Sequence, residues 1–340
     1  MFKNKQKKKD NILNSIAIWW DNNKNVKVHL DINIWHTQES KNNYLEFGLK
    51  ITDYEKIDNI NIYVPYKVEL KDIEDKANIL GAETLLTKVL FNENLDVTPF
   101  TGSFSPVKFH NEELDDFLYC KLDIQNDIEI RNQTISININ KNDASGIKTI
   151  YYRFRINKLE SIFSESNENY VFLDGLFKKI GFLELNINSI RKLPSSIIDK
   201  LTGIKFESMN LFLMTNNYTS LLFQSKEPNK SRILENHIWE KYLSPENSKN
   251  ITKIIAYHWK SKTGIFTDYN LFVKLSYMSK SITSWLLMLA TIIILGAIGG
   301  VAGNYITKCV DDLFIDNNVT TEVCKVNTNF IQKGDQNGTK

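Results

Sequence analysis

WLLMLATIIILGAIGGVAG, residues 285–303, decides the architecture of this 340-residue chain, because it is long, apolar and free of charged side chains. As an α-helix it is about 28 Å long at roughly 1.5 Å per residue, close to the roughly 30 Å hydrocarbon core of a bilayer. Trp285 and Tyr305 lie at its ends, where aromatic rings favour the membrane interface, and a lysine lies outside each of them. We therefore predict a transmembrane helix at residues 283–306. The alternative is a buried core helix.

The N-terminal residues indicate which side of the membrane holds the bulk of the chain. Residues 1–14 carry five lysines, and we predict a basic, disordered segment there that could attract anionic membrane lipids. The stretch at 12–20 is interrupted by polar residues and lacks a small-residue cleavage site, so no secretory signal is predicted. We expect the N-terminal part in the cytosol, a single pass through the cell membrane, and a short external tail at residues 307–340.

The three cysteines fit this orientation. Cys120 is alone in the large N-terminal part, and a single thiol suits a reducing compartment. Cys309 and Cys324 both follow the predicted helix, and a disulfide closing a loop of about 15 residues contributes roughly 3 kcal/mol of stability. We predict this disulfide in the tail. The alternatives are two free thiols or an acylated Cys309.

Before the membrane helix, the sequence alternates as β-strands do. Apolar residues alternate with polar ones at 26–34 and 45–51, and a third apolar run at 60–64 ends at Pro65. These three strands predict an antiparallel meander. Helical periodicity replaces the alternation at 70–91, where two short helices are expected.

Two β-rich α+β units are predicted in this part of the chain. The first spans residues 15–158 and continues, after a loop at 96–116, with strands at 117–124, 128–130, 134–140 and 147–156. After a polar boundary, the second spans residues 170–280, with strands at 182–190, 205–214, 218–224, 251–260 and 269–277 and helices at 194–201 and 231–243. The predicted fold class is α+β, predominantly antiparallel β in two β-rich units, plus one C-terminal transmembrane helix.

The chain lacks the common sequence motifs of catalysis. It has no phosphate-binding glycine loop, no nucleophile elbow and no zinc-protease motif, and its five histidines are not spaced as metal ligands. His110 precedes acidic residues at 112–116, which suit a solvated turn or helix start better than an acid–base site. We therefore predict no catalytic residue, no metal site and no cofactor. The net charge of +2 gives no reason to expect a nucleic-acid partner.

One predicted strand carries a candidate ligand site. In residues 150–156, IYYRFRI, the side chains of Tyr151, Arg153 and Arg155 share one face, opposite the apolar residues. Only five of the 42 basic residues are arginines, so two of them beside a tyrosine suggest a need for planar, bidentate contacts. We predict a small anionic ligand at this face, such as a phosphate or carboxylate. The alternative is a solvated or salt-bridged outer face of the strand.

The glycines of the membrane helix indicate self-association. Gly296 with Gly300, and Gly299 with Gly303, form two overlapping GxxxG spacings. Such spacings let a neighbouring backbone approach closely inside a bilayer. We predict a homo-oligomer that forms through this helix. The alternative is that these are the small residues common in membrane helices.

These observations lead to two hypotheses about function. The first is a membrane-anchored, non-enzymatic protein whose cytosolic β-rich part senses a ligand or partner and is coupled to a self-associating helix. A concrete version, by analogy of layout alone, is an effector that perturbs the membrane, as in anti-phage defence. The second is a scaffold or assembly subunit of a membrane protein complex. An enzyme without recognisable motifs, acting near His110, is the least favoured.

Overall fold

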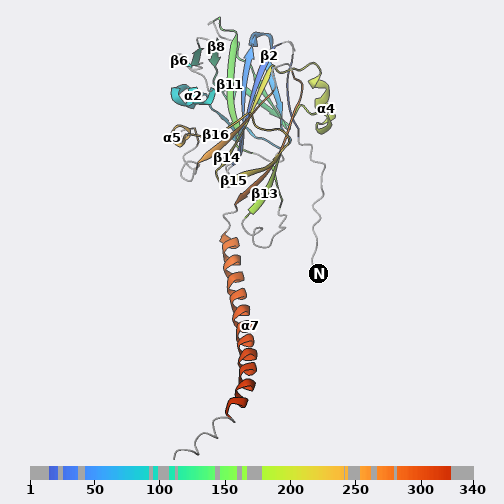
Figure 1. Ribbon diagram of the computed structural model, residues 1–340. Coiled ribbons are helices and arrows are strands. Elements are labelled where there is room, and N and C mark those ends of the chain that lie inside the picture. The colour runs from blue at the N-terminus through green and yellow to red at the C-terminus, as the bar shows by residue number, and fades with distance from the viewer. Residues whose placement is uncertain are drawn as a thin grey trace, which may run out of the picture. The chain divides into compact units, whose positions relative to one another are not determined.

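The computed structural model describes residues 15–21, 26–36, 43–91, 95–98, 107–111, 114–141, 146–158, 163–166, 178–240, 242–243, 253–261, 266–278 and 282–322. The strands and short helices between residues 15 and 278 belong to one compact unit, which we call the β-rich unit. The long helix α7 belongs to the other. Each is described by itself below (Figure 1).

Two mixed sheets form the β-rich unit. In order across the first sheet, the strands are β15 (Thr219–Gln224), β18 (Tyr269–Met278), β13 (Lys178–Ile187), β1 (Ser15–Trp20), β4 (Asn59–Tyr63), β10 (Thr134–Asn138) and β9 (Ile128–Arg131), with β12 (Phe163–Ser166) beside β13. In order across the second, they are β16 (Lys230–Ile233), β17 (Ile254–Lys260), β14 (Ser208–Asn216), β2 (Lys27–His36), β3 (Tyr44–Thr52), β11 (Thr149–Ile156), β8 (Leu114–Tyr119), β7 (Val107–Asn111) and β6 (Asp96–Thr98), with β5 (Ile73–Asp75) beside β11.

Short helices connect these strands. The α-helices are α1 (Ala77–Ala82), α2 (Thr84–Phe91), α4 (Ser195–Ile198) and α5 (Asn236–Trp239). The 3-10 helices are η2 (Tyr54–Lys56), η3 (Leu70–Asp72), η4 (Ile190–Lys192) and η5 (Asp199–Leu201).

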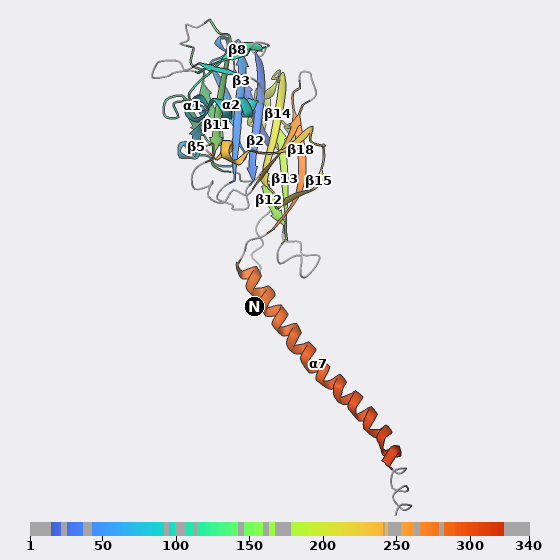
Figure 2. The ribbon, with the colours of Figure 1, turned by 60° about the vertical axis from the view of Figure 1, so that its left-hand side comes forward.

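The main core lies between the two sheets. Ile32 of β2 and Phe47 of β3, from one sheet, are fully buried in the same apolar cluster as Ile18 of β1 and Leu185 of β13, from the other. Figure 2 shows the two layers, with β2, β3 and β11 in one and β13, β15 and β18 in the other. Because strand side chains alternate between faces, the central strands contribute every second residue to this core, as Val28, Leu30, Ile32 and Ile34 of β2 do.

A second apolar cluster covers the opposite face of the ten-stranded sheet. Leu80 of α1, Leu86 of α2 and Trp239 of α5 pack there with Trp35 of β2 and Tyr151 of β11. Both faces of the central strands are therefore buried, and all eight residues of β11 are buried. This burial places the polar face of β11 inside the protein, where sequence analysis had allowed a solvated surface.

The arrangement of the strands corrects two expectations. First, β1 pairs with β13 and β2 pairs with β14, so both sheets combine strands from the two predicted units, and one β-rich unit replaces the two. Second, the expected meander is wrong, because β2 and β3 pair but β4 lies in the other sheet, between β1 and β10. Both differences arise from strand pairs that are distant in the sequence.

The expectation of predominantly antiparallel β-structure is only partly correct. The sheets are mixed, because β1 with β13, β2 with β14 and β8 with β11 are parallel pairs. The segment at 96–116, predicted as a loop, contains the strands β6 and β7, which pair with each other. The prediction of a β-rich chain with a few short helices is confirmed.

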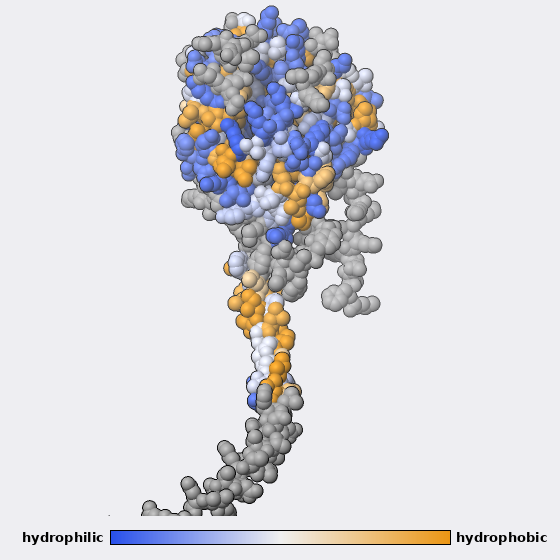
Figure 3. All heavy atoms as spheres, in the orientation of Figure 1, coloured by the Kyte–Doolittle hydropathy of each residue, from blue (hydrophilic) through white to orange (hydrophobic). Residues whose placement is uncertain are grey.

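Helix α7 (Ile282–Glu322) has 41 residues and is longer than the predicted helix at 283–306. Within the described residues, its segment Trp285–Asp311, 27 residues long, is the one helix long and apolar enough to cross a membrane. Figure 3 shows apolar side chains over much of the visible surface of α7. A helix of 41 residues is about 62 Å long, so it exceeds the thickness of a hydrocarbon core.

Candidate functional site

A network of buried polar side chains lies on the covered face of β2, β3 and β11. The register of these strands places its central members in two cross-strand rows, Asn33–Glu46–Arg155 and Asp31–Gly48–Arg153. Directly opposed side chains in neighbouring strands are close enough to interact. The alternation that buries the apolar residues between the sheets therefore brings these polar residues together on the opposite face.

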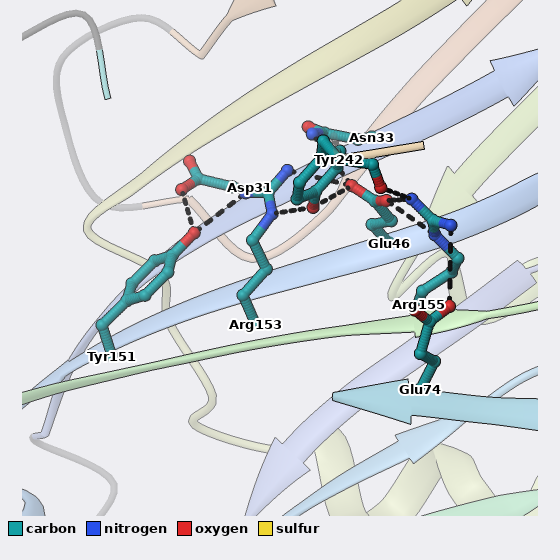
Figure 4. A network of polar contacts seen from close by, with 8 residues as sticks. All are labelled: Asp31, Asn33, Glu46, Glu74, Tyr151, Arg153, Arg155 and Tyr242. Carbon is teal, nitrogen blue, oxygen red and sulfur yellow. Dashed lines mark hydrogen bonds and ion pairs between the residues drawn. The ribbon is translucent and has the colours of Figure 1, made fainter. Parts of the chain in front are cut away.

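Glu46 is the centre of this network (Figure 4). Its side chain is fully buried, and Oε1 accepts a hydrogen bond of 2.9 Å from Arg155 Nε. Oε2 accepts from Arg153 Nη2 at 3.1 Å and from the Tyr242 hydroxyl at 2.9 Å. Burial opposes ionisation of Glu46, but the guanidinium groups of Arg155 and Arg153 outweigh it and lower the pKa of the carboxyl below its ordinary value.

Arg153 connects Glu46 to a second branch of the network. Its Nε donates to the Tyr242 hydroxyl at 2.8 Å and its Nη1 to the Tyr151 hydroxyl at 3.0 Å. The Tyr151 hydroxyl in turn donates to Asp31 Oδ2 at 3.3 Å. Burial, in part offset by Arg153, raises the pKa of Tyr151 far above its usual range. The phenol therefore stays protonated and can act as the donor to Asp31.

Arg155 leads to the third branch, which reaches the surface. Its Nη1 lies 3.6 Å from Glu74 Oε2, and its guanidinium carbon lies 3.8 Å above the ring of Tyr44. Lys76, only 1% exposed, donates to Glu74 Oε1 at 2.5 Å. Burial and the neighbouring Arg155 lower the pKa of Lys76. Three buried cationic side chains thus share one buried carboxylate and one half-exposed carboxylate, that of Glu74.

Gly48 makes room for the Tyr151 branch. A Cβ at this position would overlap the Tyr151 hydroxyl and would lie 3.0 Å from Tyr151 Cζ and 3.1 Å from the Cβ of Asp31. A side chain at position 48 would therefore displace the phenol from its position between Arg153 and Asp31.

We predict that Gly48→Ala destabilises the protein by about 1–3 kcal/mol, because a tightly packed site cannot accept an extra methyl group without movement. Urea unfolding followed by circular dichroism measures the change. Adding Tyr151→Phe to Gly48→Ala removes the atom that clashes most, so the double variant should lose less than the sum of the two single losses. Strict additivity would contradict this explanation.

The structure brings the predicted ligand residues together but gives them an internal partner. Arg153 and Arg155 are 2% and 1% exposed, and the carboxylate they bind is that of Glu46. These contacts agree with the alternative in which the arginines form salt bridges within the protein. The face of β11 that carries them is buried, however, and is not the outer surface which that alternative assumed. An external anion at Tyr151, Arg153 and Arg155 stays a prediction.

Glu46 and Tyr242 were not among the site residues predicted from the sequence. A signal for Glu46 exists, since it is an ionisable residue on the polar face of a strand whose other face is apolar. Tyr242 gives no such signal, because 196 residues separate it from Glu46. It reaches the network only because α5 packs against the sheet.

The remaining candidate residues lie away from this network. His110 Nδ1 contacts Asp116 Oδ1 at 2.5 Å, while residues 112 and 113 lie outside the described part of the chain. On α7, a Cβ added at Gly296, Gly299, Gly300 or Gly303 would meet no atom within 4 Å. The described chain thus leaves this face of α7 uncovered.

The predicted disulfide depends on the end of α7. Cys309 is exposed on this helix, and Cys324 lies outside the described residues. Helical structure continues to Glu322, which at about 1.5 Å per residue is roughly 20 Å along the axis from Cys309. A disulfide holds its two Cα atoms within about 7 Å. Pairing within one chain therefore requires the last turns of α7 to unwind, and the disulfide stays a prediction.

Comparison with known proteins does not assign this chain to a family. No family model and no curated protein matches it. Among solved structures, it is similar to the yeast delta-COP-I mu-homology domain complexed with a Dsl1 WxWxV peptide, over 80% of this chain and 78% of that one. The sequence identity is 8% and the TM-score 0.19, which is too low to inform either the fold or the function.

Proposed function

We propose that this chain is a single-pass protein of the cell membrane, with a cytoplasmic β-rich unit that binds a ligand or protein partner and a helix α7 that self-associates. The observation that carries the proposal is the apolar segment Trp285–Asp311, whose most apolar part is not buried by any described part of the chain. An exposed apolar helix of this length is stable only when another apolar medium or another chain covers it.

The connection between β18 and α7 supports coupling between the two parts. Only three residues, 279–281, separate the end of β18 from the start of α7. Strand β18 is paired on both sides, with β13 and with β15, so it moves with the sheet. A change in the β-rich unit can therefore reach α7 through a short piece of chain.

Self-association is tested with the glycine face of α7. Gly296→Leu combined with Gly300→Leu should lower the association constant in liposomes by about tenfold or more, because bulky side chains separate the backbones. Energy transfer between differently labelled copies measures association. Ala290→Leu is the control, since it places a leucine on a different face of the helix at 3.6 residues per turn. Equal association in both variants would contradict a glycine interface.

The effector version of this proposal makes a separate prediction. If association of α7 perturbs the bilayer, as proposed by analogy with anti-phage effectors, the purified protein should release a dye trapped in liposomes. The Gly296→Leu, Gly300→Leu variant should release less at equal bound protein. Absence of dye release and of growth inhibition on overexpression would leave a membrane anchor without effector activity.

A scaffold role is the second candidate, and an exposed sheet edge favours it. Strand β15 is the last strand of its sheet, and Leu222 and Phe223 on it are 52% and 56% exposed. Apolar edge strands are common sites of protein contact. This role predicts a partner that co-purifies with the wild-type chain and is lost in Leu222→Ser, Phe223→Ser.

A further inference from the structure

Three aromatic residues that carry buried hydrogen-bond donors pack together beside the Glu46 network. The donors are the indole N–H groups of Trp35 and Trp239 and the hydroxyl of Tyr44, whose residues are 0%, 4% and 3% exposed. Within the described part of the chain, no atom accepts a hydrogen bond from any of them. Buried donors are nearly always satisfied in folded proteins, and leaving one unpaired costs free energy. Three together indicate that an acceptor belongs there.

These residues form one cluster, which we call the aromatic cluster. The ring of Trp35 lies 5.4 Å from that of Tyr44 and 5.8 Å from that of Trp239. The guanidinium carbon of Arg155 lies 3.8 Å above the Tyr44 ring, so a full positive charge borders the cluster. Lys76, also buried, lies 5.1 Å from the centre of the nearby Tyr242 ring. The surroundings therefore favour an acceptor that carries negative charge.

Glu46 does not supply this acceptor. Its two oxygens already accept from Arg155 Nε, Arg153 and the Tyr242 hydroxyl, and Arg155 Nη2 also lies 2.9 Å from Oε1. A carboxylate has about four lone-pair positions, so its capacity is used. The Tyr242 hydroxyl likewise accepts from Arg153 and donates to Glu46. The donors of the aromatic cluster need an acceptor from elsewhere.

We propose that the aromatic cluster binds the oxyanion of a soluble small molecule that carries a phosphate or carboxylate group. Trp35, Tyr44 and Trp239 donate hydrogen bonds to its oxygens, next to the guanidinium group of Arg155, which is also paired with Glu46 and Glu74. This site lies beside the anion site predicted at Tyr151, Arg153 and Arg155. It differs from that site because it uses the donors of the aromatic cluster, which have no acceptor in the described part of the chain. This inference rests on the proposed ligand-binding role of the β-rich unit and does not depend on α7 crossing a membrane.

The test uses the full chain in detergent and measures its unfolding temperature by calorimetry. Sodium phosphate and sodium acetate are titrated against sodium chloride at equal ionic strength. We expect a saturable rise in unfolding temperature with at least one oxyanion and none with chloride. Trp239→Phe and Tyr44→Phe, which each remove one donor and keep an aromatic ring, should weaken this response by about tenfold or more in apparent dissociation constant.

Trp20→Phe is the matched control. Trp20 is 1% exposed and its indole N–H is also without a partner in the described chain, but it belongs to the core between the sheets. Its replacement should change the unfolding temperature without changing the response to the oxyanion. Absence of any oxyanion response, or an equal response in Trp239→Phe and wild type, would overturn the proposal. Failure of α7 to insert into membranes would overturn only the anchoring role.

Discussion

Glu46→Gln is expected to lower the unfolding temperature of this protein by about 10 °C. The substitution removes the one fully buried carboxylate that Arg153 and Arg155 share, and both guanidinium groups remain 1–2% exposed. Removing one partner of a buried ion pair typically costs about 3–5 kcal/mol, because the other charge stays buried without compensation. For a domain of this size, each kcal/mol corresponds to roughly 2–4 °C. Calorimetry of the full chain in detergent measures the change.

The matched control is Glu74→Gln. Glu74 contacts Arg155 and Lys76, but its own side chain is 40% exposed and Arg155 keeps Glu46 as its partner. Lys76 is 1% exposed, but its lowered pKa lets it lose its charge when Glu74 is replaced. We therefore expect a smaller loss for this variant than for Glu46→Gln. Similar losses for Glu46→Gln and Glu74→Gln would show that burial does not set the strength of the network.

The difference in stability between the wild type and Glu46→Gln is expected to depend on pH. Because the pKa of Glu46 in the folded state lies below its ordinary value of 4.5, the carboxylate stabilises the fold fully above that pH. This contribution is lost as the pH falls through the lowered pKa. The difference in unfolding temperature between wild type and Glu46→Gln should therefore shrink below about pH 4. A constant difference down to pH 2 would contradict it.

Ile294→Arg combined with Ile298→Arg is expected to remove the protein from membranes. Both residues are exposed on α7 and lie near the middle of Trp285–Asp311. Insertion scales give about 2.5–3.5 kcal/mol for each arginine at the centre of a membrane helix. Two of them shift the equilibrium by roughly 10³-fold or more. The fraction that stays in the membrane pellet after alkaline extraction measures the effect.

Ile294→Leu combined with Ile298→Leu is the control, because it keeps the apolar surface and changes only its shape. This variant should remain in the pellet as the wild type does. Release of the wild-type chain by alkaline extraction would show that α7 is covered by protein contacts instead of lipid. The exposed apolar surface of α7 would then mark an interface with another chain.

Local features of the fold were predictable from the sequence, and distant ones were not. The apolar run at 285–303 depends only on the composition of neighbouring residues, and so does the alternation that predicted β2 and β3. Which strands pair depends on segments more than 150 residues apart, as in β1 with β13 and β2 with β14. Periodicity within one strand carries no information about such partners.

The candidate site shows the same limit at the level of single residues. The alternation correctly placed Tyr151, Arg153 and Arg155 on one face of a strand. It could not show whether that face meets water, a ligand or protein, because buried ion pairs and solvated charges use the same residue types. The covering residues, such as Trp239 and Tyr242, come from the segment predicted as a helix at 231–243, whose periodicity does not indicate which strands it covers.

The long-range pairing also has a consequence for how this chain folds during synthesis. Strands β1 and β2 leave the ribosome first, but Ser15 and His29 find their partners Asn186 and Ser208 only 171 and 179 residues later. At about 5–20 residues per second, these strands wait roughly 10–30 s with unpaired backbone edges. Apolar strands with open edges aggregate readily. The first half of the nascent chain is therefore the part most exposed to aggregation until the second half has been synthesised.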